Sequence, residues 1–435
     1  MGTRSRLHAQ LLALVVAMST LTGLVAGCNV RGEDAASRIN RILYVDTEGR
    51  ILTVLPDGSD RRQLTPAGDV FTSAGMGIQG QLQVLSDWSL WSPDARLVAY
   101  TRQEMDGLSR LSRALYVMQA DGSRPVKLFE DAQSVPFFMY WSPDSQWLAF
   151  FLSDSREQRL MVVPADGSRP ASVLASGAPA YFAWSPDSHR ILLHLGGSTQ
   201  RNPAARLTAI NLDSRQSEVI DQKPGEFGAP AWSPDGRRIA YVVHGPDDDS
   251  LWTADAQGEA RQLVATLPGG GSLSWSPDGA RLGYLSGAHP DAPFGFLATY
   301  DLAARVETVL ARGPLVAFFW SPDGKRIAYI TADTGKSQLV WHVAEVTGGQ
   351  ERVISTFAPT AHLDFLLDFF DQYALSMSFW SPDSRYLVYP ALGNGETLSP
   401  RGASTFGDVV YVAPADGGAP PRAIAEGRFA SWSRK

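Results

Sequence analysis

The sequence predicts an all-β protein, an eight-bladed β-propeller built from four-stranded antiparallel blades. Three observations predict this fold: a repeated motif, a four-strand pattern within each repeat, and two incomplete pieces at the ends of the repeat array. The motif is a short strand that ends in Trp-Ser, and in seven of its eight copies Pro-Asp follows directly. The motif tryptophans lie 43 to 60 residues apart and are Trp91, Trp141, Trp184, Trp232, Trp275, Trp320, Trp380 and Trp432. An internal repeat of this length is typical of propellers and solenoids.

The repeat that begins at Trp232 shows the four strands. Pro234-Asp235-Gly236 predicts a tight turn, because Pro presets φ, Asp bonds to nearby backbone and Gly accepts a positive φ. Three further strands are expected, because each stretch is rich in β-branched and aromatic side chains or flanks a second Gly turn. These stretches are residues 238–243, 250–255 and 260–264. We expect the repeated Trp to pack between blades, and the Ser and Asp of the motif to bond within the turn.

The two ends of the array complement each other. Residues 42–46, 51–55 and 63–65 match the second, third and fourth strands of a repeat, and residues 429–432 match the first. A blade shared by both ends would close the ring and remove its open edges. The alternative is a seven-bladed ring with one divergent repeat.

The first residues resemble a bacterial lipoprotein signal. Residues 1–27 carry Arg4 and Arg6, then a short apolar stretch, then small residues, which is typical of a secretion signal. The run 24–28, Leu-Val-Ala-Gly-Cys, resembles a lipobox, and Cys28 is the single cysteine of the chain. We therefore expect lipidation of Cys28, a short linker over 28–38 and the propeller over 39–435. The protein is expected to be extracytoplasmic and lipid-anchored to a bacterial membrane, either the outer membrane or the outer face of the cytoplasmic membrane. The alternative is an ordinary signal peptide that happens to contain a cysteine.

The motif Trp-Ser-Pro-Asp-Gly-x-x-Ile-Ala-Tyr at 232–241 and 320–329 resembles the TolB-type, WD40-like (PD40) propeller repeat. The resemblance covers about 39–435 and implies a propeller fold. Repeats of this type occur in envelope translocation proteins, peptidase propellers and polysaccharide lyases, so the resemblance leaves the function open.

The formal charge of −7 argues against nucleic acid as a partner. We expect a monomeric propeller with no cofactor, whose partner is a protein or glycan of the cell envelope. In a propeller the loops joining strand two to three and strand four to the next blade share one face, and here those loops vary most. This variable face is the expected binding surface. The candidate partner-binding residues are Phe71, Met76, Phe294, His362, Phe365, Phe369, Phe370, Tyr373, Arg401 and Phe406.

The most distinctive insertion covers residues 357–379. Its stretch 362–371 predicts one short helix with Asp364, Asp368 and Asp371 on one face and apolar side chains on the other. Two interpretations stay open: a segment that packs over the central channel, or an exposed apolar anchor for a partner.

Signals for catalysis and metal binding are weak. The sequence has no zinc spacing, no Gly-x-Ser-x-Gly elbow and no phosphate-binding loop. Asp247, Asp248, Asp249 and His289 are weak metal candidates. Oligogalacturonate lyases share this repeat, and the resemblance implies that metal ligands could come from distant blades. The expected function is a non-catalytic scaffold; the alternatives are a polysaccharide lyase or hydrolase with a site at the channel mouth, and a TolB-like subunit of an envelope complex.

Overall fold

The structure is a computed structural model that describes residues 40–65, 88–106, 110–132, 134–153, 158–197, 202–225, 228–393 and 407–434. The chain divides into two units, Met1–Ser37 and Arg38–Lys435, and all described residues belong to the second. The signal segment and Cys28 therefore lie outside the described residues. No helix in the described part of the chain has the length and hydropathy needed to cross a bilayer.

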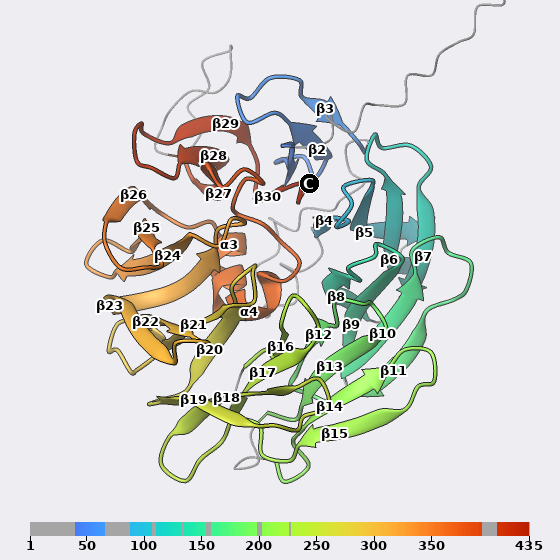
Figure 1. Ribbon diagram of the computed structural model, residues 1–435. Coiled ribbons are helices and arrows are strands. Elements are labelled where there is room, and N and C mark those ends of the chain that lie inside the picture. The colour runs from blue at the N-terminus through green and yellow to red at the C-terminus, as the bar shows by residue number, and fades with distance from the viewer. Residues whose placement is uncertain are drawn as a thin grey trace, which may run out of the picture. The chain divides into compact units, whose positions relative to one another are not determined.

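The second unit is all-β apart from two short helices, and its strands form antiparallel sheets that follow one another around a common centre (Figure 1). Five sheets have four strands each. The first, in the order β3-β2-β1-β30, comprises β3 (Arg62–Gln63), β2 (Ile51–Val54), β1 (Ile42–Val45) and β30 (Phe429–Trp432). The second comprises β4 (Ser89–Trp91), β5 (Leu97–Asp106), β6 (Arg110–Gln119) and β7 (Val126–Asp131). The third comprises β8 (Val135–Trp141), β9 (Trp147–Ser153), β10 (Gln158–Pro164) and β11 (Ser172–Ser176). The fourth comprises β12 (Ala180–Trp184), β13 (Arg190–Leu195), β14 (Arg206–Asn211) and β15 (Ser217–Asp221). The fifth comprises β16 (Ala231–Trp232), β17 (Arg238–Val243), β18 (Asp249–Asp255) and β19 (Gln262–Leu267).

Two further sheets depart from the four-strand pattern. A seven-stranded sheet comprises β20 (Gly271–Trp275), β21 (Arg281–Ser286), β22 (Phe294–Asp301), β23 (Val306–Trp320), β24 (Arg326–Asp333), β25 (Gln338–Glu345) and β26 (Glu351–Phe357). A three-stranded sheet comprises β27 (Tyr386–Leu392), β28 (Asp408–Pro414) and β29 (Arg422–Glu426). Between them lie α3 (Ala361–Asp368) and α4 (Phe370–Tyr373).

Both departures have a local cause. β23 is 15 residues long and pairs with β22 along its first part and with β24 along its second, so it is the outer strand of one repeat and the inner strand of the next. The chain there runs straight from one repeat into the next without a loop. Beside β27, the predicted inner strand is reduced to a single bridge between Trp380 and Leu387, because helical residues occupy the preceding segment.

The motif residues make the contacts that the sequence predicts. In all seven Trp-Ser-Pro-Asp turns the Ser Oγ donates to the Asp Oδ1, at 2.5–2.7 Å. The residue after Asp has a positive φ in every turn, whether it is Gly236 at 69° or Ser145 at 63°. The motif tryptophans are buried or nearly so, and five donate Nε1–H to the carbonyl that precedes the tryptophan of the neighbouring repeat. These bonds join adjacent inner strands, so the motif organises the contact between sheets.

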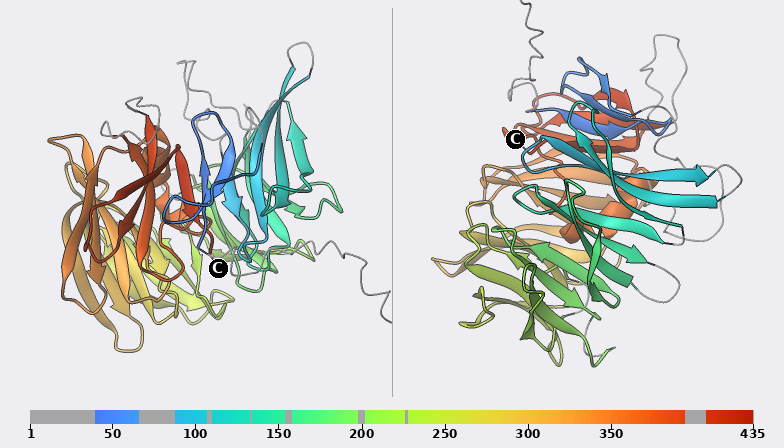
Figure 2. Two further views of the ribbon diagram at one scale, coloured as in Figure 1. Left: turned by 90° about the horizontal axis from the view of Figure 1, so that it is seen from above. Right: turned by 90° about the vertical axis from the view of Figure 1, so that its right-hand side faces the viewer.

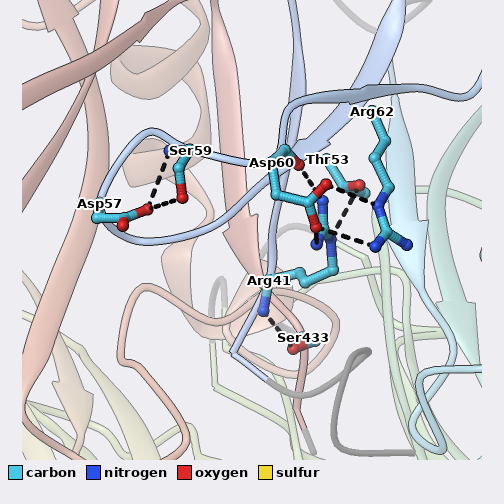
Figure 3. Close-up of polar contacts among 7 residues, drawn as sticks. All are labelled: Arg41, Thr53, Asp57, Ser59, Asp60, Arg62 and Ser433. Atoms are coloured by element: carbon cyan, nitrogen blue, oxygen red, sulfur yellow. Dashed lines mark hydrogen bonds and ion pairs between the residues drawn. The ribbon is translucent and has the colours of Figure 1, made fainter. Parts of the chain in front are cut away.

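Both ends of the described unit meet in the first sheet. β1 pairs with β30 in antiparallel register, from Ile42 opposite Trp432 to Val45 opposite Phe429. Figure 3 shows the polar contacts beside this pairing. Arg41 is buried; its backbone N–H donates to Ser433 Oγ at 3.3 Å, and its guanidinium donates to Asp60 Oδ2 at 2.7 Å. The predicted sharing of one sheet by the first and last strands is therefore present.

Candidate functional site

The candidate site is residues 357–379, which we call the central insertion. It leaves β26, forms α3 and α4, and leads into Trp380. Figure 1 shows both helices in the middle of the surrounding sheets, and Figure 2 shows them from two further sides. Thr360 begins α3 because its side chain accepts a hydrogen bond from the backbone N–H of Leu363 at 3.2 Å.

The single helix predicted over 362–371 is wrong in one respect. The helix stops at Asp368, and Phe369 has φ −131° and ψ 35°, outside helical geometry. A second short helix then starts at Phe370. Consequently Asp371 does not share a face with Asp364 and Asp368: those two are exposed, whereas Asp371 turns toward the sheets.

Gln372 attaches α4 to the inner edge of the fourth sheet. Its Oε1 accepts from the backbone N–H of Phe182, and its Nε2 donates to the carbonyl of the same residue, both at 2.9 Å. Phe182 lies on β12, an innermost strand, whose central-facing backbone groups have no further strand to pair with. The side-chain amide therefore acts as a one-residue extension of the sheet, with both buried backbone groups satisfied.

Asp371 joins α4 to two more repeats. Its Oδ2 accepts from the backbone N–H of Ala229 at 2.9 Å and from Ser272 Oγ at 3.4 Å. Loss of water raises the pKa of Asp371 above its ordinary value, although these hydrogen bonds oppose the rise. Tyr181 lies nearby: burial and then the charge of Asp371 both raise the pKa of its phenol.

An aromatic cluster surrounds the two helices. Tyr373 packs against Trp88 and Phe138, each with ring centroids 4.6 Å apart. Phe370 packs against Phe318 at 5.6 Å and, on the same side, against other rings of the seven-stranded sheet. Since these partners come from distant repeats, the apolar side of the insertion is part of the main hydrophobic core.

This packing bears on the predicted partner-binding residues. The structure brings Phe294, Phe365, Phe369, Phe370 and Tyr373 together around the insertion. Phe370, Tyr373 and His362 are buried, and the other three are partly buried. The burial favours the interpretation in which the insertion packs over the central channel, and Asp364 and Asp368 lie on its exposed side. Loss of water, then the charge of Asp364, raises the pKa of Asp368.

The remaining candidates for partner binding lie outside the described residues: Phe71, Met76, Arg401 and Phe406.

The weak metal candidates do not converge. Asp249 is buried and its Oδ1 lies 2.9 Å from His244 Nδ1, while Asp247 and Asp248 are exposed. His289 Nδ1 accepts from the backbone N–H of Asp291 within its own turn, at 3.1 Å. Within the described ranges no three His, Cys, Asp or Glu side chains form a group that could hold a metal ion.

Sequence reasoning did not identify Gln372 or the separate role of Asp371. Gln372 and Phe182 are 190 positions apart, and no local pattern marks an amide that completes a strand edge. The one available signal was the polar pair Asp371-Gln372 within an otherwise aromatic stretch.

The repeated antiparallel sheets and the motif turns define an all-β repeat protein, an arrangement typical of propellers. Residues 151–291 match the PD40 family, described as the TolB beta propeller domain, so this part of the chain carries the repeat that the motif predicts. The Tol-Pal system protein TolB of Alcanivorax borkumensis is 32% identical over 91 residues, which are 21% of this chain and 20% of that protein. The chain thus spans about a fifth of the length of this curated relative.

Solved structures support the fold alone. An oligogalacturonate lyase in complex with manganese has a TM-score of 0.50 at 16% identity, covering 86% of this chain and 95% of the lyase. A dihydro-haem d1 dehydrogenase has a TM-score of 0.54 at 12% identity, covering 91% of this chain and 76% of that protein.

Proposed function

We propose that this protein is a lipid-anchored, extracytoplasmic propeller scaffold that binds a protein or glycan of the cell envelope through its variable face. One observation carries the proposal: the central insertion is held to several repeats by Gln372, Asp371 and aromatic packing, and its outer side presents Asp364 and Asp368. A rigid support that displays a polar, irregular surface is the usual arrangement of a binding site on a repeat scaffold.

The propeller in this proposal has eight blades and is closed. Five four-stranded sheets, a seven-stranded sheet in which β23 serves two repeats, and a three-stranded sheet with the Trp380 bridge support eight blades. The pairing of β1 with β30 supports closure by both ends of the array.

The lipid anchor is tested by Cys28→Ser in a bacterial host. We expect the wild-type protein to fractionate with membranes and to carry a lipidated Cys28 by mass spectrometry, and the variant to lose both properties. A wild-type protein that is found without lipid, or that is cleaved elsewhere, would contradict the anchor.

Partner binding is tested by changing the exposed side of the insertion. Deletion of 357–379 is unsuitable because it removes core side chains such as Phe370 and Tyr373. The double variant Asp364→Lys, Asp368→Lys changes exposed residues only. The matched control is Glu218→Lys, Glu259→Lys, which alters the net charge equally at exposed outer positions. We expect crosslinked envelope partners to be lost with the first variant and kept with the second; equal capture by both would contradict the assignment.

A second candidate function is catalytic. The supporting observation is Asp371, a carboxyl with a raised pKa beside Ser272 and Tyr181 at the centre of the molecule. A carboxyl of this kind is suited to proton transfer during cleavage of an acidic polysaccharide. Formation of unsaturated products from oligogalacturonate with Mn²⁺, abolished by Asp371→Asn, would support this function; no turnover by the wild-type protein would reject it.

A further inference from the structure

A cavity of about 370 Å³ lies beside three of the Trp-Ser-Pro-Asp turns. Its rim includes Pro277, Pro322 and Pro382, each from a Trp-Ser-Pro-Asp turn. Phe319 and Trp380 contribute to its apolar wall. The cavity lies beyond the end of α4, where residues after the helix return to the inner strands.

Arg434 is the cation of this cavity. Its Nη2 donates to the carbonyls of Leu375, Ala374 and Met377, which follow α4 in the chain. These three bonds hold the guanidinium at the wall of the cavity. Arg434 as a whole residue is exposed, whereas its guanidinium lies against the protein at these carbonyls.

The charge of Arg434 has no acidic partner within the part of the chain that the structure describes. None of the ion pairs found among the described residues includes Arg434. The surrounding protein removes water from the guanidinium and lowers the pKa of Arg434, with only the phenol of Tyr140 acting in the opposite direction. Arg281, by contrast, pairs with Asp301 at 3.1 Å.

We propose that this cavity binds a carboxylate attached to an apolar body. A cation that is partly stripped of water and has no counter-charge is stabilised by an incoming anion. A guanidinium can hold a carboxylate through paired, charge-assisted hydrogen bonds. One cation within aromatic, proline and methionine side chains matches a singly charged ligand with an apolar body better than a phosphate. The volume lies within the range of small-ligand sites.

This binding site is separate from the surface of the proposed scaffold function. The cavity is lined in part by Ala374 and Met377 of the central insertion but includes neither Asp364 nor Asp368. The test below therefore has an outcome that is independent of partner capture.

The test measures binding of N-acetylphenylalanine to the full chain by isothermal titration calorimetry. N-acetylphenylalanine amide, which has the same body without the carboxylate, is the matched probe. We expect the free acid to bind at least tenfold more tightly than the amide. Equal binding of the two, or no binding of either, would overturn the proposal.

Three variants assign the site. Arg434→Met keeps the apolar stem and removes the charge, so we expect the preference for the acid to disappear. Arg434→Lys keeps the charge without the fork of donors, and we expect it to retain part of the preference. Arg237→Met removes an exposed charge from another Trp-Ser-Pro-Asp turn and should leave binding unchanged. Near-ultraviolet circular dichroism confirms that each variant is folded; a folded Arg434→Met that still prefers the acid contradicts the assignment.

The source of the carboxylate is distinguished by a third probe, an octapeptide that ends in phenylalanine with a free carboxylate. Binding as tight as that of N-acetylphenylalanine indicates that a polypeptide C-terminus fits the cavity. Binding of the short acid alone indicates a free organic acid.

Discussion

At the scale of single residues, the repeated motif owes its composition to backbone hydrogen bonding. Ser233 is representative: its Oγ donates to Asp235 Oδ1 at 2.6 Å and accepts from the backbone N–H of Arg238 at 2.9 Å. The hydrogen bond from Ser233 lowers the pKa of Asp235 below its ordinary value. Each residue of the turn thus satisfies a polar group that the reversal of the chain would otherwise leave unpaired.

The first prediction concerns this turn. Ser233→Ala should lower the free energy of unfolding by about 1 kcal/mol at neutral pH, because the hydrogen bonds of one hydroxyl are lost. Because a carboxyl with a lowered folded pKa stabilises the fold above its unfolded pKa of 3.8, the difference should shrink as the pH falls below that value. Urea denaturation at pH 7 and pH 3 measures it. Ser217→Ala, at an exposed position of β15, should change little; an equal effect of both variants would contradict the prediction.

The second prediction concerns Asp371. Burial raises the pKa of Asp371 in the folded state, so the ionised carboxylate disfavours folding. The stability that protonated Asp371 contributes is fully present below pH 3.8 and is lost as the pH rises through the folded pKa. Asp371→Asn should therefore gain stability relative to the wild type as the pH rises above 3.8. Thermal unfolding across this range checks the sign, with exposed Asp364→Asn as the control. If the stability difference between Asp371→Asn and the wild type narrows as the pH rises, the assignment is refuted.

At the scale of secondary-structure elements, the inner and outer edges of the sheets are treated differently. Seven pairings of a third strand with a fourth strand contain a register shift. Such a bulge twists the outer strand and makes its free edge a poor template for another chain. At the inner edge of β12, Gln372 completes the hydrogen bonding instead.

The third prediction tests the inner edge. Gln372→Ala removes the partners of a buried N–H and a buried carbonyl of Phe182, so we expect a loss of about 2 kcal/mol or more in the free energy of unfolding. Hydrogen exchange at the amide of Phe182 should accelerate in parallel. Gln257→Ala, in an exposed turn, is the matched control and should unfold like the wild type. Unchanged exchange at Phe182 would show that the amide does not protect this strand.

At the scale of the whole molecule, contacts between the first and last strands join the two ends of the repeat array. Arg41 is central to this region because it bonds to Thr53 Oγ1 at 3.1 Å as well as to Asp60, and its backbone bonds to Ser433. Arg62 contacts the same Asp60 carboxylate from the surface, with 37% of its side chain exposed against 4% for Arg41. One carboxylate therefore has a buried and an exposed arginine partner.

The fourth prediction uses this pair. Arg41→Met should destabilise the protein by about 3 kcal/mol or more, since it removes a buried partner of several groups. Arg62→Met should cost less than about 1 kcal/mol, as an exposed ion pair does. Denaturation midpoints measure both. Similar losses for the two variants would show that the contacts beside β1 and β30 contribute little to the stability of the molecule.

Much of the fold could be predicted from the sequence because its signals are local. The Trp-Ser-Pro-Asp turn, the strands on either side of it and the pairing of residues 42–46 with 429–432 follow from repeat spacing and turn chemistry. The sequence does not predict that β23 serves two repeats, because no local residue pattern marks a strand that continues from one repeat into the next without a loop. The break at Phe369 was also missed, since the aromatic pattern on either side suits one helix as well as two.

By itself, the sequence determined the all-β repeat architecture, because hydrogen bonding within a turn and alternation within a strand involve residues close in the chain. The tertiary structure decided what occupies the centre: that Gln372 meets Phe182, that Asp371 faces Ala229, and that Arg434 meets an apolar cavity. These contacts join residues 59 to 190 positions apart. The energies of these contacts depend on how deeply the polar groups are buried and on whether they have hydrogen-bond or charge partners. Both are set only when distant repeats are brought together.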